Sequence, residues 1–170
     1  MPSSAFPSVL EVGVISDTHG LLRPQALAVL QGCDHLLHAG DIGKPDILDR
    51  LRELAPLTAV RGNNDHGSWA AALPETVTVS LGGVVIYLLH DLAQLPPGAL
   101  AAAAAQVVVS GHSHRPGVVM KDGLCFLNPG SAGPRRFRLP VTLARLGIAA
   151  GRATPRVLEL DLGAAATSAR

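Results

Sequence analysis

Residues 9–20 read VLEVGVISDTHG, an apolar run rich in β-branched residues that gives way to two metal-binding side chains. The run VLEVGVIS is typical of a strand buried on both faces. Asp17 and His19 follow it, and in extended backbone two residues at this spacing project from the same face. Because open α/β sheets bind ligands beyond the carboxyl ends of their strands, this stretch predicts a buried strand that carries the start of a binding site.

Two more strand-like runs and two helical patterns complete the first 63 residues. HLLHA and LTAVRG indicate short strands, and Asp41 and Asn63 follow them. Apolar spacing predicts helices over Pro24–Leu30 and Asp46–Leu54. Strands that alternate with helices indicate an α/β fold in which right-handed crossovers join parallel strands.

The second half of the chain has a hairpin-rich pattern. TVTVSL and VVIYLLH flank a glycine pair, which predicts a two-residue turn, and the second arm leads to His90. Alanine propensity predicts a helix over Pro96–Ala105. QVVVSG indicates a buried strand that leads to His112 and His114. GVVMKDGLCFLN predicts a second hairpin, and VTLARL with RVLELDL predicts a last antiparallel pair.

Length and composition favour one globular domain over residues 1–170, with residues 163–170 as a frayed tail. The net charge is +1 and the only basic cluster is Arg135, Arg136 and Arg138, so we expect no dedicated nucleic-acid surface. No apolar stretch is long enough to span a bilayer, and neither cysteine belongs to a CxxC pair. We therefore expect a cytoplasmic protein with no membrane partner and two reduced, buried cysteines.

Seven side chains able to bind a divalent ion lie in five short blocks at the ends of predicted strands: Asp17, His19, Asp41, Asn63, His90, His112 and His114. Two carboxylates, four imidazoles and one amide oxygen form a mixed set that suits manganese, iron, zinc or a similar first-row ion. Seven ligands are too many for one ion and suit two. Glycines flank the ligands, which fits a close approach of the backbone to an ion or a phosphate.

The blocks DTHG, GD, GNND, H and GHSH, in this order, resemble the calcineurin-like metallophosphoesterase family. GNND followed by GHSHRP and NPGS is more closely similar to the small single-domain YfcE-type phosphodiesterases, and the resemblance spans roughly residues 11–160. It implies a four-layer α-β-β-α sandwich of two mixed β-sheets flanked by helices. It also implies a metal-dependent hydrolase of phosphoric esters.

The resemblance divides the ligands between two ions: Asp17, His19 and His114 for the first, Asn63, His90 and His112 for the second, and Asp41 as the bridge. The reaction it supports is attack on phosphorus by a hydroxide bridging the two ions. Two divalent ions, two carboxylates and one hydroxide leave a charge of about +1, which a phosphodiester monoanion neutralises. We therefore expect a small phosphodiester as substrate and manganese as the preferred metal, with iron, zinc or nickel as alternatives.

Two positions depart from the family pattern. Asn64 stands where many members have a His that protonates the leaving oxygen, and an amide cannot supply that proton near neutral pH. We expect Asn64 to hydrogen-bond the bound phosphate and the enzyme to favour esters with good leaving groups. Leu92 replaces the second His of the HGH that relatives often carry, and we expect it to alter the substrate side of the site.

Other functions and other residues remain open at this point. A Vps29-like interaction scaffold of the same fold family is the alternative outside enzymes, and phosphomonoesters or cyclic nucleotides are the alternative substrates. The apolar second hairpin could supply a homo-oligomer surface. We expect His38 to be a buried non-ligand and His35 a surface residue. His66 could orient metal-bound water, but this is the less favoured alternative. Three arginines could reach an anionic substrate but are expected to be solvated: Arg61, Arg135 and Arg136.

Overall fold

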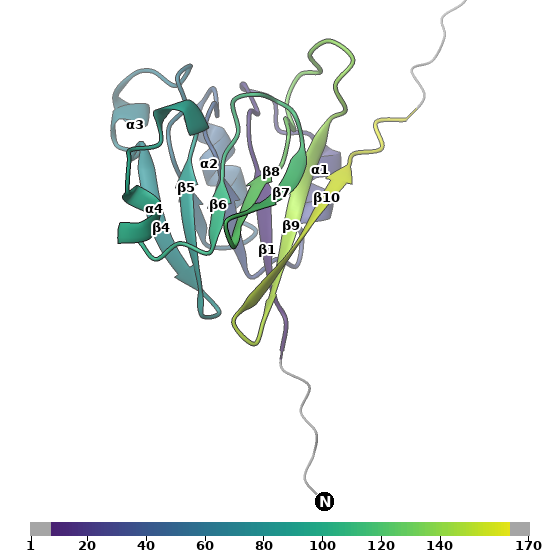
Figure 1. Cartoon of the computed structure of the whole chain (residues 1–170). Coiled ribbons are helices and arrows are strands. Elements are labelled where there is room, and N and C mark those ends of the chain that lie inside the picture. The colour runs from purple at the N-terminus through teal and green to yellow at the C-terminus, as the bar shows by residue number, and fades with distance from the viewer. Residues whose placement is uncertain (1–7, 164–170) are drawn as a thin grey trace, which may run out of the picture.

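The computed structural model describes residues 8–163 and contains two five-stranded β-sheets (Figure 1). The strands are β1 (Leu10–Ile15), β2 (His35–His38), β3 (Leu57–Ala59), β4 (Thr76–Leu81), β5 (Val84–Leu89), β6 (Val107–Val109), β7 (Gly117–Lys121), β8 (Leu124–Asn128), β9 (Thr142–Ala149) and β10 (Arg152–Glu159). The helices are α1 (Pro24–Leu30), α2 (Pro45–Arg52), α3 (Ser68–Ala71) and α4 (Ala99–Ala102), with a 3-10 turn η1 (Leu92–Gln94).

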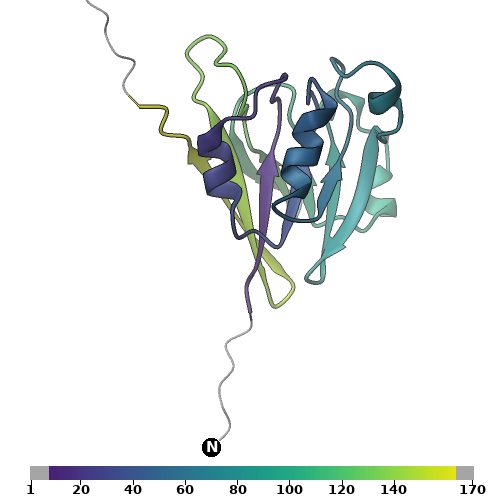
Figure 2. The same ribbon diagram turned by 180° about the vertical axis from the view of Figure 1, so that it is seen from behind.

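The first sheet has the strand order β10-β9-β1-β2-β3. Strands β1, β2 and β3 are parallel, with Ile15 opposite His38 and His38 opposite Ala59. Helices α1 and α2 form the crossovers between them and cover the outer face of this sheet (Figure 2). The predicted βαβ units are confirmed, and the parallel arrangement brings the carboxyl ends of the three strands to one edge.

The second sheet has the order β4-β5-β6-β8-β7 and includes both predicted hairpins. The β4–β5 turn consists of Gly82 and Gly83, both at positive φ, as a tight hairpin turn requires. Strand β6 pairs in parallel with β5 and with β8, so both sheets are mixed. The edge strand β7 exposes Val118, Val119 and Met120, while the expected homo-oligomer surface on this hairpin stays a prediction.

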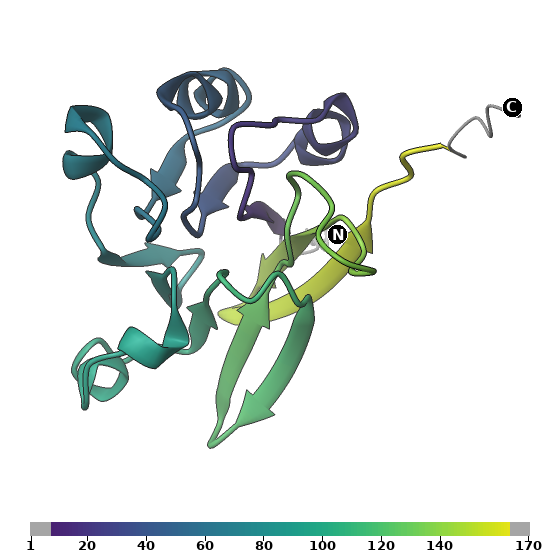
Figure 3. The same cartoon turned by 90° about the horizontal axis from the view of Figure 1, so that it is seen from above.

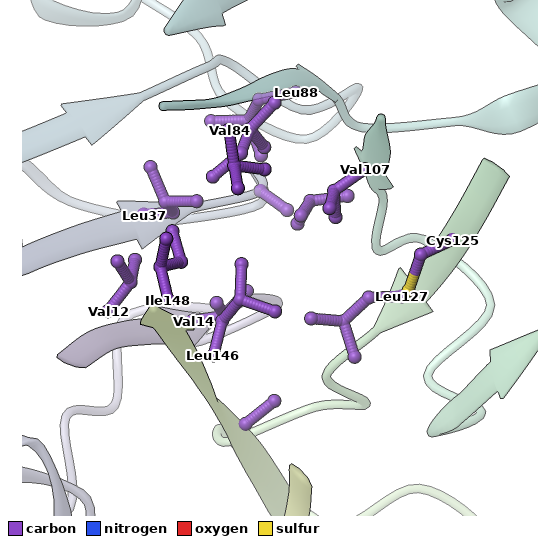
Figure 4. Packing of buried hydrophobic residues seen from close by; sticks show 14 of the residues in the cluster. Val12, Val14, Leu37, Val84, Leu88, Val107, Cys125, Leu127, Leu146 and Ile148 are labelled. Carbon is purple, nitrogen blue, oxygen red and sulfur yellow. The ribbon is translucent and has the colours of Figure 1, made fainter. Parts of the chain in front are cut away.

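The main core lies between the two sheets and consists of aliphatic side chains (Figure 4). Val14 and Leu146 of the first sheet are fully buried in the same cluster as Leu88 and Leu127 of the second. A second cluster lies under α1 and α2, and a smaller third one lies under η1 and α4. These layers confirm the α-β-β-α sandwich that the family resemblance implied.

The helix predicted over residues 96–105 is mostly wrong, because only Ala99–Ala102 is helical. Gly98 before it and Ala104 after it both have left-handed backbone, and the chain must then turn into β6. Alanine propensity does not outweigh these closely spaced tertiary constraints. The third strand is also shorter than the predicted run, ending at Ala59.

The remaining predictions about the whole chain have mixed outcomes. Cys33 and Cys125 are free and buried, as expected. Of the predicted tail, residues 164–170 lie outside the described part of the chain. Within residues 8–163, no helix is long and apolar enough to cross a membrane.

Candidate metal centre

The seven predicted ligands converge at the carboxyl edge shared by the two sheets. Figure 3 views the molecule from this edge, where the loops after β1, β2 and β3 face the segments that follow β5 and β6. Residues distant in the sequence meet there: His19 Nε2 lies 3.3 Å from His114 Nε2, and His112 Nδ1 lies 3.1 Å from Asn63 Oδ1. The convergence follows from parallel pairing, which ends these strands at one edge.

One group contains Asp17, His19 and His114. Asp17 Oδ1 lies 3.2 Å from His114 Nε2 and 3.7 Å from His19 Nε2. Asp17 is fully buried, and its Oδ1 has no hydrogen-bond partner among residues 8–163. Three possible ligand atoms, one oxygen and two nitrogens, therefore face one point.

The other group contains Asn63, His90 and His112. Asn63 Oδ1 lies 3.0 Å from His90 Nε2 and 3.1 Å from His112 Nδ1. His90 is buried and its Nδ1 contacts the carbonyl oxygen of Ala39 at 2.7 Å, whereas Asn63 and His112 are exposed. This group is the one open to solvent.

Asp41 lies between the two groups. Its Oδ2 is 3.7 Å from His19 Nε2 and 3.4 Å from His90 Nε2. Asn64 donates to both oxygens of this carboxylate, through its backbone N–H at 2.8 Å and its side-chain amide at 2.7 Å. Asp41 thus has the position that a bridging ligand needs, and Asn64 holds its carboxylate in place.

The donor set fits divalent metal. Two imidazole nitrogens that face each other at 3.3 Å cannot both carry a proton. In a tetrahedral site with bonds of about 2.0–2.1 Å, ligand atoms lie about 3.3 Å apart, which is close to the separations within each group. Carboxylates, imidazoles and an amide are the ligands that first-row ions accept.

The titration of these groups supports the same chemistry. Burial raises the pKa of Asp17, but the nearby His114 imidazole and the hydrogen bond from Ser16 outweigh it, so the pKa is lowered. Burial also raises the pKa of Asp41, but the contact with His90 and the hydrogen bonds from Asn64 lower it on balance, so both carboxyls are ionised. Burial also lowers the pKa of His19, which favours the neutral imidazole that binds metal. For His90 burial acts in the same direction, but the contact with Asp41 raises its pKa on balance.

Five of the seven ligands have left-handed backbone, a feature that the sequence did not reveal: Asp17 (φ 54°), His19 (φ 44°), Asp41 (φ 54°), His112 (φ 67°) and His114 (φ 59°). This conformation costs an L-residue about 1 kcal/mol or more and is best tolerated by Asn, Asp and His. Backbone hydrogen bonds between the first two ligand loops hold it, from Asp17 N to Gly40 O at 3.0 Å and from His19 N to Asp41 O at 2.9 Å.

A buried network behind the ligands connects the same two loops. His38 Nδ1 accepts from Gly40 N at 3.1 Å, so its Nε2 carries the proton and donates to Thr18 Oγ1 at 3.0 Å. The hydroxyl of Thr18 donates in turn to the carbonyl of Ile42 at 2.9 Å. Burial lowers the pKa of His38 to about 4. The predicted burial of His38 is confirmed, and both of its ring nitrogens contact protein atoms. The role of Thr18 was missed because nothing in the sequence marks it.

Two glycines in the ligand loops are required by space. A Cβ at Gly62 would collide with the backbone and carboxylate of Asp41, and a Cβ at Gly111 would come within 2.6 Å of an Asp17 oxygen. The N–H of Gly62 also donates to Asp65 Oδ2 at 2.8 Å, so the Asp65 side chain orders this loop. The backbone therefore passes close to Asp41 and Asp17 at these glycines, whereas its predicted approach to an ion or a phosphate stays a prediction.

The other candidate residues lie outside the two groups. His35, expected at the surface, is partly exposed there, and its Nε2 contacts Thr58 Oγ1 at 2.8 Å. Arg61 is bound by Glu75 at 2.6 Å, so it is not simply solvated. Three others are exposed: His66, Arg135 and Arg136.

Comparison with known proteins identifies the family. Residues 10–151 match the calcineurin-like phosphoesterase superfamily domain. The chain belongs to this superfamily. A probable metallophosphoesterase from Methanothermobacter thermautotrophicus is 35% identical over 141 residues, which cover 76% of this chain and 81% of that protein. The site is accordingly that of a metal-dependent phosphoesterase family.

Solved structures with the calcineurin-like phosphoesterase fold include proteins of different kinds. An archaeal phosphodiesterase aligns with a TM-score of 0.72 and 21% identity, covering 87% of this chain and 99% of its own. Vacuolar protein sorting 29 from Cryptosporidium parvum also aligns with a TM-score of 0.72 and 21% identity, covering 91% and 98%. At this identity the likeness establishes the fold, and the choice between catalysis and scaffolding depends on the site.

Proposed function

We propose that this chain is a phosphodiesterase that depends on two divalent ions, with manganese as the preferred metal. The observation that carries the proposal is the arrangement of seven potential ligands in two groups with Asp41 between them. Asp17, His19 and His114 would hold one ion, Asn63, His90 and His112 the other, and Asp41 both.

The chain's own residues have defined tasks in this scheme. When bound, the ions supply a hydroxide nucleophile near neutral pH and polarise the phosphoryl oxygens. Asp41, held ionised by the hydrogen bonds from Asn64, keeps the two groups in register. The Asn64 amide uses one N–H for Asp41 and has a second to offer to a phosphoryl oxygen.

The diester preference rests on charge and on the missing proton donor. Two divalent ions, two carboxylates and one hydroxide give a charge of about +1, which matches a diester monoanion. Asn64 stands where a general acid would stand, so esters with poor leaving groups should react slowly. Both considerations disfavour alkyl phosphomonoesters.

An interaction scaffold is the second candidate, because the fold is shared with vacuolar protein sorting 29. Complete occupation of the ligand positions by Asp, Asn and His argues against it. A scaffold has no need for five ligand residues in a costly backbone conformation.

The test is metal reconstitution. Protein stripped with a chelator is reloaded with manganese, iron, zinc or nickel in turn, and hydrolysis of methyl p-nitrophenyl phosphate is compared with that of p-nitrophenyl phosphate. We expect manganese to restore the diesterase activity most strongly, and calorimetry to detect two bound ions. Hydrolysis of neither ester with any metal would overturn the proposal in favour of the scaffold.

A further inference from the structure

A cleft of about 480 Å³ adjoins the open side of the metal centre. Asn63 and His90, both of the solvent-open ligand group, form part of its wall. The rest is built from the loop after β3, the start of β4 and the segment after β5, and the polar side chains there are Arg61, Asp65, His66, Glu75, Thr76, Asp91 and Gln94. A volume of this size accommodates a small organic group.

The lining disfavours two classes of substrate group. Among residues 8–163, no Phe, Tyr or Trp lines the cleft, and only the smaller imidazole of His66 is an exposed ring on which a nucleobase could stack. The one arginine is already engaged, because Arg61 donates to Glu75 at 2.6 Å and to the carbonyl of Leu73 at 3.2 Å. A second phosphate would therefore find no free guanidinium.

The charges of the side chains in the cleft also disfavour a second anionic group. Arg61 and Glu75 neutralise each other as a pair, and Asp65 accepts from the N–H groups of Gly43 and Gly62, while Asp91 adds a further negative charge to the lining. Its Oδ1 accepts from Ala93 N at 3.0 Å, which fixes the carboxylate, and its Oδ2 lies 3.8 Å from His112 Nε2. An additional anionic group would be repelled here, whereas a hydroxyl could donate to the carboxylate.

Two uncharged polar side chains complete the lining. Thr76 and Gln94 are exposed, and each offers both a donor and an acceptor. Donors and acceptors spread over a small, non-aromatic cleft match a compact group with several hydroxyls.

We propose that this cleft binds the second alcohol of the phosphodiester, the one not expelled, as a neutral polyhydroxylated group such as glycerol. The proposal rests on the phosphodiesterase function above and narrows its substrate class. Thr76, Asp91 and Gln94 determine the specificity by hydrogen-bonding the hydroxyls of that group, while the metal centre holds the phosphoryl group beside it.

The experiment compares esters that share one leaving group. The manganese-loaded protein is given glyceryl, methyl, aminoethyl and thymidine 5′ p-nitrophenyl phosphate, so that only the second alcohol varies. We expect kcat/KM for the glyceryl ester to exceed that for the methyl ester about tenfold, equivalent to about 1.4 kcal/mol. A thymidine or aminoethyl ester that reacts faster than the glyceryl ester overturns the proposal, because stacking or charge would then dominate.

Shape-matched variants assign the effect to the cleft. Thr76→Val and Gln94→Leu remove hydrogen-bonding groups, and together they should reduce the ratio of kcat/KM for the glyceryl ester to kcat/KM for the methyl ester from about ten to about one. Thr78→Val is the control, because Thr78 is also exposed on β4 but does not line the cleft. A preference that survives in the double variant, or that disappears in Thr78→Val, contradicts the proposal.

Failure of this inference differs from failure of the proposed function. Hydrolysis of the methyl ester with no preference for the glyceryl ester refutes the cleft assignment alone. Hydrolysis of no ester refutes the phosphodiesterase, and calorimetric affinities for the glyceryl and methyl esters then test the cleft by themselves. Equal affinities would overturn it.

Discussion

The two ends of strand β2 carry the same pair of side chains with different consequences. His35 at the amino end contacts Thr58 Oγ1 at 2.8 Å, and His38 at the carboxyl end contacts Thr18 Oγ1 at 3.0 Å. His35 is half-buried, and Thr58 lies on the adjacent strand β3. That contact only reinforces strand pairing that the backbone already provides.

At the carboxyl end the contact joins loops instead of neighbouring strands. His38 is fully buried, and through Thr18 it connects the loop of Asp17 and His19 to the loop of Asp41. The same kind of His–Thr contact can therefore stabilise strand pairing at one edge of a sheet and position metal-binding loops at the other. The variants below test that distinction.

The largest loss of activity is expected from substitution of Asp41, which follows the carboxyl end of β2. Asp41→Asn removes a charge that both ligand groups share, so we expect diesterase activity to fall about a thousandfold, or about 4 kcal/mol of transition-state stabilisation. Asp34→Asn is the matched control, because Asp34 accepts from Glu11 N at 2.8 Å at the amino end. Steady-state kinetics decide the comparison, and an Asp41→Asn enzyme with normal activity would remove Asp41 from the site.

The loss of stability at low pH should come mainly from His38, at the carboxyl end of β2. His38 has its pKa lowered to about 4, so between pH 6.5 and pH 4 the unfolded chain binds the proton and the folded chain does not. The free energy of unfolding is therefore highest above pH 6.5. It falls by about 3 kcal/mol as the pH is lowered from 6.5 to 4, where His38 becomes protonated in the folded chain as well. Urea unfolding in chelator at several pH values measures it.

The matched substitutions for this prediction are His38→Gln and His35→Gln. The first should reduce the pH dependence more than the second, whatever the effect of either on stability at neutral pH. The carboxylates of Asp17 and Asp41 have lowered pKa values and act below this window, whereas His19, whose pKa is also lowered by burial, contributes equally to both variants. An unchanged acid profile in His38→Gln would show that the proton is taken up elsewhere.

Thr18→Val should loosen the ligands. The hydroxyl is replaced by a methyl group, which leaves the His38 N–H without a partner. The Ile42 carbonyl loses one of its two hydrogen bonds and keeps the one from Gly20 N at 2.8 Å. We expect manganese affinity, measured by calorimetry, to fall about 10- to 100-fold, as is usual when support behind a ligand is lost. Thr18→Ser keeps the hydroxyl and should bind metal nearly as the parent does; equal loss in both variants would argue for packing instead of positioning.

The smallest effect is expected from Thr58→Val at the opposite end. Loss of the His35 contact should reduce the free energy of unfolding by about 1 kcal/mol or less, because the group is only half-buried. Manganese affinity should not change. A loss of metal binding as large as that of Thr18→Val would show that the two ends do not differ in function.

Much of the site could be predicted because local pattern and topology agree there. The change from an apolar run to DTHG locates Asp17 at a strand end, and parallel pairing then brings it to Asp41. The glycine pair at residues 82–83 likewise specifies its own turn. These features depend on a few neighbouring residues.

What could not be predicted depends on contacts made by the folded chain. Thr18 lies between two predicted ligands, at a position where the DxH pattern specifies no residue type. Its role depends on the contacts with His38 and Ile42 that form only in the folded chain. The half-burial of His35 results from pairing with β3. The truncated helix at Ala99–Ala102 shows the same limit, because left-handed residues on both sides confine it.

The left-handed backbone of the five ligand residues has a consequence for engineering. Glycine adopts this conformation without the penalty that a side chain incurs, so a glycine at one of these positions removes backbone strain but also loses the contacts of the side chain. A screen that selects only for heat resistance would therefore place no value on keeping the metal-binding side chains. Thermostable descendants of this protein need selection for ion retention in the same round.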